Sequence, residues 1–182
     1  MKNVFVSLFV FIALTVTQAF GYDLKTFSKD TKIIAAMELL EEAGEYEVFT
    51  NMKKNAVKVK FDALPYSNVY AANVYDHFGR RIIVINSTYK NAPIEQIACL
   101  IAHESCHVAR KATLEEESIA TSKEAQCWMK LKQIGKTYPQ NKLTRRLDKL
   151  TNLYLASTED GNNYIEDKIA SSSFYRTQYG FN

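Results

Sequence analysis

Residues 98–108, ACLIAHESCHV, place His103, Glu104 and His107 within an otherwise apolar stretch. Two histidines four positions apart on a helix project from the same face, so both imidazoles can reach one metal ion. Glu104 follows His103 directly and can reach a water molecule on such a metal without binding the metal, as a general base requires. The H-E-x-x-H spacing therefore predicts a zinc ion with a base beside it.

The residues that flank this pattern are strongly apolar, which indicates a buried helix. They include Ile97, Leu100 and Ile101 before the first histidine and Val108 after the second. A buried polar cluster costs several kcal/mol unless something satisfies its hydrogen-bonding groups, and a metal ion would do so. The alternative is a pair of histidines on an ordinary polar helix face.

A catalytic zinc ion usually takes a third protein ligand and keeps one position for water. The next predicted helix is rich in glutamates, and it can fold back on the first around residues 111–112. Glu117 then comes nearest to the level of the histidines. Glu124 lies on nearly the same face, about 10 Å further along at 1.5 Å per residue. We expect Glu117 to be the third ligand, with Glu124 as the reserve ligand or as a partner that orients a histidine.

Three stretches ahead of the histidines carry strand patterns. Val57, Val59 and Phe61 alternate with lysines, which predicts a strand within 55–61 with one wet face. Residues 69–86 predict a second strand, a turn near Asp76–Gly79 and a third strand over Arg81–Ile85, forming a hairpin. The apolar run IIVI indicates that the third strand is covered on both faces.

The rest of the chain is predominantly helical in pattern. Asn91 can cap a helix with Pro93 in its first turn, and this helix is expected to continue to about Lys111. Thr113 and Glu116 form a capping-box signature for the next helix, which Gly135 ends. Further helices are predicted over 29–44, 142–156 and part of 158–170, followed by an irregular aromatic tail. This order predicts one α+β domain.

The first 21 residues have the three-part form of a secretory signal peptide. A positive start precedes a 13-residue apolar run and a short stretch that ends in small residues. Cleavage is expected after Gly21, with Ala19 as second choice. The run is short for a membrane span, which needs about 20 apolar residues, so an uncleaved anchor is the alternative. We therefore expect an exported (periplasmic or secreted) domain, 22–182, with no membrane segment after cleavage.

The charge balance excludes some partners. The 182-residue chain has a formal net charge of +3 and no basic run interleaved with aromatic residues, so nucleic-acid binding is not expected. The chain length is appropriate for a single hydrophobic core. The sequence does not determine the oligomeric state.

The three cysteines are an odd set, so at least one must be free or pair outside the chain. Cys106 lies about 60° from the histidine face, given 3.6 residues per turn, and is expected to pack rather than bind metal. If a disulfide forms, Cys99 and Cys127 are the expected pair, because they come level when the two helices fold back. His77 is expected at the surface of the hairpin turn and Trp128 in the core.

The segment LIAHESCHVAR, followed by TLEEESIATSKEAQCW, resembles the gluzincin branch of the zincin metallopeptidases. The resemblance covers about residues 69–128. It implies a zincin-like α+β fold with a small, mostly antiparallel sheet, in which RRIIVIN corresponds to the edge strand along which substrate lies. It also implies a zinc ion held by His103, His107 and Glu117, with Glu104 as the base.

The expected function is therefore that of a zinc metallopeptidase acting on a peptide or protein substrate through zinc-activated water. Tyr164, Tyr175 and Tyr179 are candidates for a proton donor or oxyanion stabiliser, with aromatic packing as the alternative for each. The rival interpretation is an exported binding or structural protein on a zincin-like scaffold, without turnover.

Overall fold

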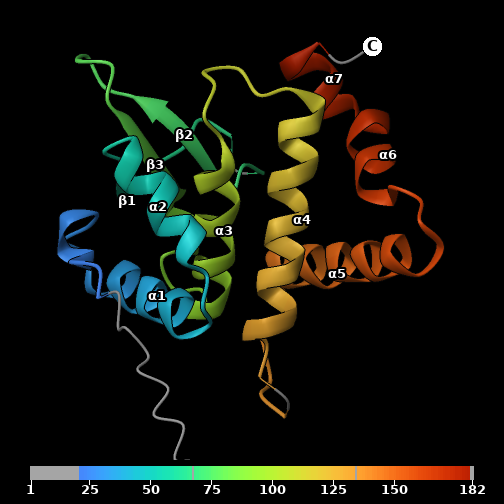
Figure 1. Cartoon of the computed structure of the whole chain (residues 1–182), viewed down its shortest axis with the longest axis horizontal. Helices are drawn as coiled ribbons and strands as arrows, with labels where there is room; N and C mark the ends of the chain where they lie inside the picture. The colour runs from blue at the N-terminus through green and yellow to red at the C-terminus, as the bar shows by residue number, and fades with distance from the viewer. Residues whose placement is uncertain (1–20, 67, 134, 181–182) are drawn as a thin grey trace, which may run out of the picture.

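The computed structural model of the chain describes residues 21–66, 68–133 and 135–180 (Figure 1). The predicted signal peptide falls almost entirely on residues 1–20, outside the described part. The architecture is α+β, as predicted. In chain order the elements are η1 (Leu24–Thr26), α1 (Thr31–Glu42), α2 (Tyr46–Lys54), β1 (Lys58–Asp62), β2 (Ala71–Tyr75), β3 (Arg81–Asn86), η2 (Ser87–Tyr89), α3 (Ile94–Cys106), α4 (Leu114–Leu131), α5 (Lys142–Asp160), α6 (Tyr164–Ser171) and α7 (Ser173–Tyr179).

The sheet has three strands in the order β1-β3-β2. The predicted hairpin is confirmed: β2 and β3 are antiparallel, with Tyr75 opposite Arg81. The prediction of a mostly antiparallel sheet is wrong, because β1 and β3 are parallel and pair Lys58 with Ile82. After β1 the chain crosses to the far edge of the sheet, and the hairpin then returns β3 to the centre beside β1.

The resemblance assigned the wrong strand to the sheet edge. RRIIVIN forms the central strand β3. The edge strand that lies near the H-E-x-x-H residues is β2. Five of the six β3 residues are buried, which agrees with the expectation that this strand is covered on both faces. A strand that is apolar on both faces is favoured in the centre of a sheet, where both faces and both edges are covered.

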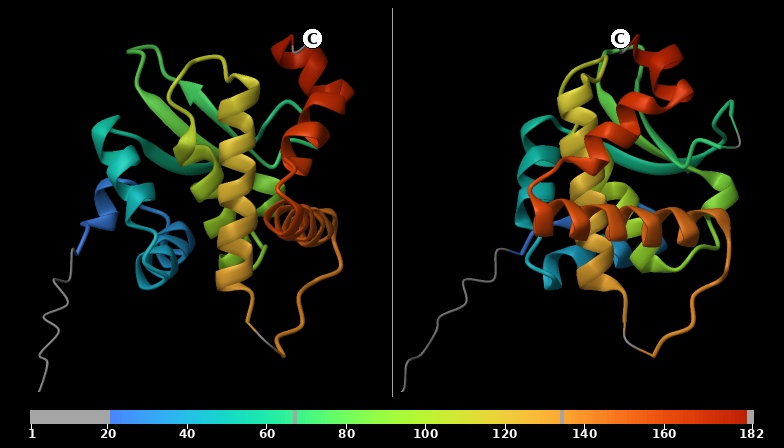
Figure 2. Two further views of the ribbon diagram at one scale, coloured as in Figure 1. Left: turned by 45° about the vertical axis from the view of Figure 1, so that its right-hand side comes forward. Right: turned by 90° about the vertical axis from the view of Figure 1, so that its right-hand side faces the viewer.

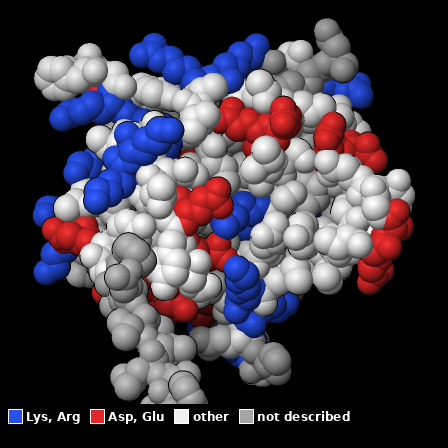
Figure 3. All heavy atoms as spheres, in the orientation of Figure 1, with Lys and Arg blue, Asp and Glu red and all other residues white. Residues whose placement is uncertain are grey.

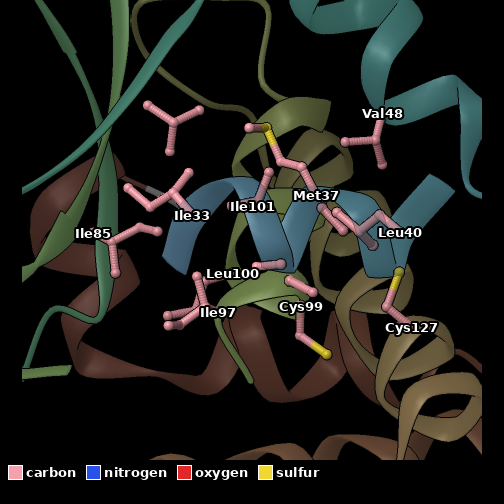
Figure 4. Packing of buried hydrophobic residues seen from close by; sticks show 14 of the residues in the cluster. Ile33, Met37, Leu40, Val48, Ile85, Ile97, Cys99, Leu100, Ile101 and Cys127 are labelled. Carbon is pink, nitrogen blue, oxygen red and sulfur yellow. The ribbon is translucent and has the colours of Figure 1, made fainter. Parts of the chain in front are cut away.

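Helix α3 runs through the centre of the molecule and packs against α1, α2, α4 and the sheet. Figure 4 shows how its residues Ile97, Leu100 and Ile101 meet Ile33 and Met37 of α1. All residues from Glu95 to Ser105 are buried, so the helix has no solvated face. The apolar flanks of the histidine pattern thus form core, as predicted.

Several helix boundaries differ from the predictions. Helix α3 begins at Ile94 with Pro93 as its N-cap, so neither the Asn91 cap nor a first-turn Pro93 is found. Helix α5 continues to Asp160, where Gly161 at φ 77° ends it. The aromatic tail, expected to be irregular, forms α7, and α2 has no counterpart among the predicted elements.

The C-terminal helices enclose α4 on the side away from α1 (Figure 2). Helix α5 crosses α4, and the Nε1 atom of Trp128 on α4 donates a 2.8 Å hydrogen bond to Asp148 of α5. The Nε2 atom of Gln96 on α3 donates another 2.8 Å bond to Thr144 of α5. These buried or half-buried contacts fix α5 against both helices of the predicted metal site.

The remaining side-chain expectations have mixed outcomes. Trp128 is buried in the core and His77 is exposed in the hairpin turn, as predicted. Cys99, Cys106 and Cys127 are all free, so the expected Cys99–Cys127 disulfide is absent. Cys99 and Cys127 instead pack as small apolar side chains in the core cluster. Among the helices that the structure describes, none is long and apolar enough to cross a membrane.

Replacing Ile101 by Ala tests the central position of α3. Ile101 is 0% exposed, so the change should lower the free energy of unfolding by about 2–5 kcal/mol through lost burial and a residual cavity. The control is Ile119→Ala, because Ile119 is 56% exposed on α4 and should change stability by less than about 0.5 kcal/mol. Urea titration followed by circular dichroism measures both, and equal losses would contradict this assignment of the core.

Candidate metal centre

The site is built at the C-terminal end of α3. The helix ends at Cys106, earlier than the expected Lys111, and His107 adopts an extended conformation at φ −72°, ψ 128°. The backbone N–H groups of Val108 and Ala109 donate to Glu116 Oε1, at 2.5 and 3.4 Å. Glu116 therefore takes the amide groups that would have continued the helix, and the chain turns away.

The predicted capping box is only half formed. Thr113 Oγ1 accepts the backbone N–H of Glu116 at 3.1 Å, as a capping threonine should. The Glu116 side chain does not return this bond, because it reaches across to Val108 and Ala109 instead. Glu116 thus stabilises the loop between the two helices.

Three side chains from α3, its C-cap and α4 converge at this point. The Nε2 atoms of His103 and His107 lie 3.3 Å apart. The Glu117 carboxylate spans the pair, with Oε2 3.8 Å from His103 Nε2 and Oε1 3.7 Å from His107 Nε2. All three residues are buried, and one ligand atom from each lies within 4.8 Å of the others.

The geometry of this group fits a tetrahedral metal ion. Ligand atoms at about 2.0–2.1 Å from such an ion are separated from one another by about 3.3 Å. The two imidazole nitrogens already have this spacing, and small rotations of the Glu117 carboxylate would bring its oxygen to the same distance. Two imidazoles and one carboxylate are also a donor set that zinc accepts. This buried group could therefore hold a metal ion.

Glu124 lies on the opposite side of the His103 ring from this group. Its Oε2 atom is 3.1 Å from His103 Nδ1, while the Nε2 atom of the same ring faces Glu117. Glu124 is 0% exposed, and Arg146 of α5 hydrogen-bonds its other carboxylate oxygen. Glu124 is therefore placed to orient the His103 ring, and it is not one of the three residues that converge at the candidate metal site.

Glu104 is held by Asn73 of the edge strand β2. The Asn73 Nδ2 atom donates to Glu104 Oε2 at 2.7 Å and to the Glu104 main-chain oxygen at 2.9 Å. That carbonyl would ordinarily accept from Val108 N–H, but this group donates to Glu116. One side-chain amide thus replaces the missing helical bond and fixes the carboxylate beside the histidines.

The protonation states follow from burial and neighbouring charges. Burial, with Glu117 and Glu124 close by, raises the pKa of Glu104 to about 7 although His103 and Asn73 lower it. Burial, together with the charges of His103 and Arg81, lowers the pKa of His107 to about 3, so this imidazole is neutral and able to bind metal. Burial also lowers the pKa of His103, but the hydrogen bond and charge of Glu124, together with the charges of Glu104 and Glu117, raise it overall.

A cleft of about 370 Å³ opens onto the group. Residues 68–73, which lead into and include part of β2, form one wall, and Ala109, Arg110 and Ala112 in the loop form another. Arg146, Phe174 and Tyr175 close one end. Of the two proton-donor candidates whose side chains the structure describes, Tyr175 lines the cleft, whereas Tyr164 lies outside it and donates to Asp160 at 2.5 Å. The Tyr179 side chain lies outside the described part.

Sequence reasoning missed two residues of the site. Asn73 is the single amide in the strand AANVY. Its polar side chain among apolar and aromatic neighbours was the feature of the sequence that could have pointed to it. Arg146 follows Arg145 in an amphipathic helix and had no such signal, because either arginine could have been the solvated one. Cys106 donates to the Ala102 carbonyl and lies outside the group of His103, His107 and Glu117.

Comparison with models of protein families, with curated proteins and with solved structures gave no match to this chain. The interpretation of the site therefore depends on its residues and their geometry.

Replacing Glu117 by Gln tests the third ligand. Removing the carboxylate charge should weaken zinc binding by at least about 100-fold, more than the 10–100-fold effect of an orienting partner. Zinc content per chain after dialysis against buffered zinc measures the loss. The matched control is Glu115→Gln, which removes an exposed charge from the same helix turn and should retain the wild-type zinc content. Equal zinc content in both variants would exclude Glu117 as a ligand.

Proposed function

We propose that the protein is a zinc-dependent metallopeptidase of the gluzincin type. In this proposal His103, His107 and Glu117 hold one zinc ion, and Glu104 is the general base. The observation that carries the proposal is the placement of Glu104. It is buried beside the ligand group and held by Asn73, yet it is not one of the three converging ligands.

A purely structural site would gain nothing from a base such as Glu104 beside the ligands, whereas the buried Glu124 can serve either kind of site by orienting His103. A structural zinc ion is normally closed by four protein ligands, whereas the described residues offer a group of three beside a cleft. Three ligands leave a position for water, and the cleft gives a substrate access to it. These two features favour an enzyme over the rival non-catalytic binding protein.

Bound zinc supplies the Lewis acidity that activates water and polarises a carbonyl at neutral pH. Glu104 accepts the proton of the attacking water and then delivers it to the leaving amine. Asn73 keeps the Glu104 carboxylate in position for both transfers. Arg146 and Glu124 fix the His103 ring so that its Nε2 atom faces the ligand group.

Tyr175 is the candidate for stabilising the developing oxyanion or donating a proton. It lines the cleft together with His103 and Glu117. Burial raises the pKa of its phenol, so the hydroxyl remains a hydrogen-bond donor throughout the neutral range. A peptide or protein substrate is favoured because the cleft runs beside β2, and an edge strand can pair with an extended chain.

Export belongs to the same proposal. It depends on the signal-peptide pattern of the first 21 residues, with the mature domain beginning at about Tyr22. N-terminal sequencing of the protein isolated from the periplasm or the culture medium tests export directly, and the sequence should begin at about Tyr22.

Replacing Glu104 by Gln should abolish turnover and leave zinc in place. The amide cannot accept the proton, so kcat should fall by about 10²–10⁴-fold, while the three ligands are unchanged. A peptide library incubated with each protein, followed by mass spectrometry, measures cleavage, and metal analysis measures zinc. Full activity in the variant would contradict the role of Glu104. Zinc binding without any cleavage by the wild type would favour the non-catalytic alternative.

The pH dependence of the reaction should report Glu104. A general base must be ionised to act, so kcat/KM should rise with pH as Glu104 loses its proton. Without metal the pKa of Glu104 is about 7, chiefly because of burial, and a bound cation would lower this pKa. This rising limb should therefore be centred at or below pH 7. Asn73 lowers this pKa through its hydrogen bond, so Asn73→Ala should move the limb to higher pH. The control is Asn68→Ala at the cleft rim, which should leave the limb in place.

A further inference from the structure

A second hollow lies at the opposite edge of the sheet. Strand β2 borders the cleft, whereas β1, the other edge strand, borders a hollow of about 590 Å³. The segment from Lys25 to Asp30 forms its second wall, and the backbone N–H of Val59 donates to the Phe27 carbonyl at 2.8 Å to join the two walls. A backbone hydrogen bond therefore holds the two walls of the hollow together.

Lysines dominate the lining of this hollow. Five of its side chains are Lys25, Lys29, Lys58, Lys60 and Lys90, all exposed. Figure 3 shows many Lys and Arg side chains on the side of the molecule that carries the sheet and α2, with some acidic side chains between them. The lining of the hollow is thus more positively charged than the almost neutral protein as a whole.

Among the residues that the structure describes, four of these five lysines have no acidic partner. Lys60 pairs with Asp62 at 2.6 Å. Over the described ranges, no carboxylate oxygen lies within 4.0 Å of the ammonium group of Lys25, Lys29, Lys58 or Lys90. Lys58 is held at the rim by a hydrogen bond to the Thr26 carbonyl.

The single acidic residue in the lining does not neutralise them. Asp30 Oδ1 accepts the backbone N–H groups of Lys32 and Ile33 at 2.9 and 3.2 Å, so its charge is directed to the N-terminus of α1. Four like charges around one hollow repel one another in the absence of a counter-charge. This arrangement favours the binding of a multiply charged anion.

We propose that this hollow binds a ligand that carries a short chain of phosphate groups, with on the order of four negative charges to match the four unpaired ammonium groups. Lysine ammonium groups bind phosphate oxygens as point charges and do not require a fixed planar geometry. The two aromatic residues of the lining, Phe27 and Phe61, are buried and half-buried, so the hollow offers no exposed ring on which a nucleic-acid base could stack. The proposal does not depend on the metallopeptidase activity.

Calorimetric titration of the full exported chain with inorganic tripolyphosphate tests the proposal. The protein is first freed of metal with a chelator, so that removal of zinc by the ligand cannot contribute heat. Binding should be measurable at low ionic strength and weaken at about 0.15 M salt, where the Debye length is about 8 Å. Orthophosphate should bind at least about tenfold more weakly, because it contacts fewer lysines.

A pair of charge-matched variants makes the test specific. Lys29→Gln with Lys90→Gln should weaken tripolyphosphate binding by at least about tenfold. Lys142→Gln with Lys149→Gln removes two exposed lysines from α5 and should change the affinity by less than about twofold. Equal losses in both variants, absence of binding in the wild type, or tighter binding of a glutamate hexapeptide than of tripolyphosphate would each overturn the proposal.

Discussion

The structure depends on one constraint, which is the burial of ionisable groups at the C-terminal end of α3. His103, Glu104 and His107 are all nearly inaccessible to water, and removing such groups from water costs several kcal/mol each unless they are paired. Two of the neighbouring elements supply partners for these groups. Helix α4 contributes Glu117 and Glu124, and β2 contributes Asn73.

The same constraint explains why helices far apart in sequence must pack closely. Glu124 is itself fully buried, so its negative charge needs an oppositely charged partner. Arg146 of α5 is that partner. Burial would raise the pKa of Glu124, but Arg146 and His103 lower it overall, so the carboxylate stays ionised. The chain of contacts from α5 through α4 to α3 thus links the orientation of one imidazole to the docking of three helices.

The early end of α3 is part of this arrangement. An unbroken helix would have used Val108 N–H to satisfy the Glu104 carbonyl, and the Asn73 amide would have had only the carboxylate to bind. Because Glu116 takes that N–H instead, Asn73 binds both oxygens and fixes the proposed base by two points. The C-terminal end of α3 therefore combines a helix-termination device with the positioning of Glu104.

The sequence by itself determined the features that depend on local spacing. The His103–Glu104–His107 pattern, the buried α3, the Thr113 cap and the β2–β3 hairpin all follow from helical or strand periodicity over a few residues. Only the tertiary structure decided which strand occupies the edge, that Glu124 contacts His103, and that Asn73 and Arg146 lie at the candidate site. These features depend on contacts between elements that 20 or more residues separate in the sequence, such as the Glu124–Arg146 and Asn73–Glu104 contacts. No short-range periodicity encodes such distances, because the packing of the whole core sets them.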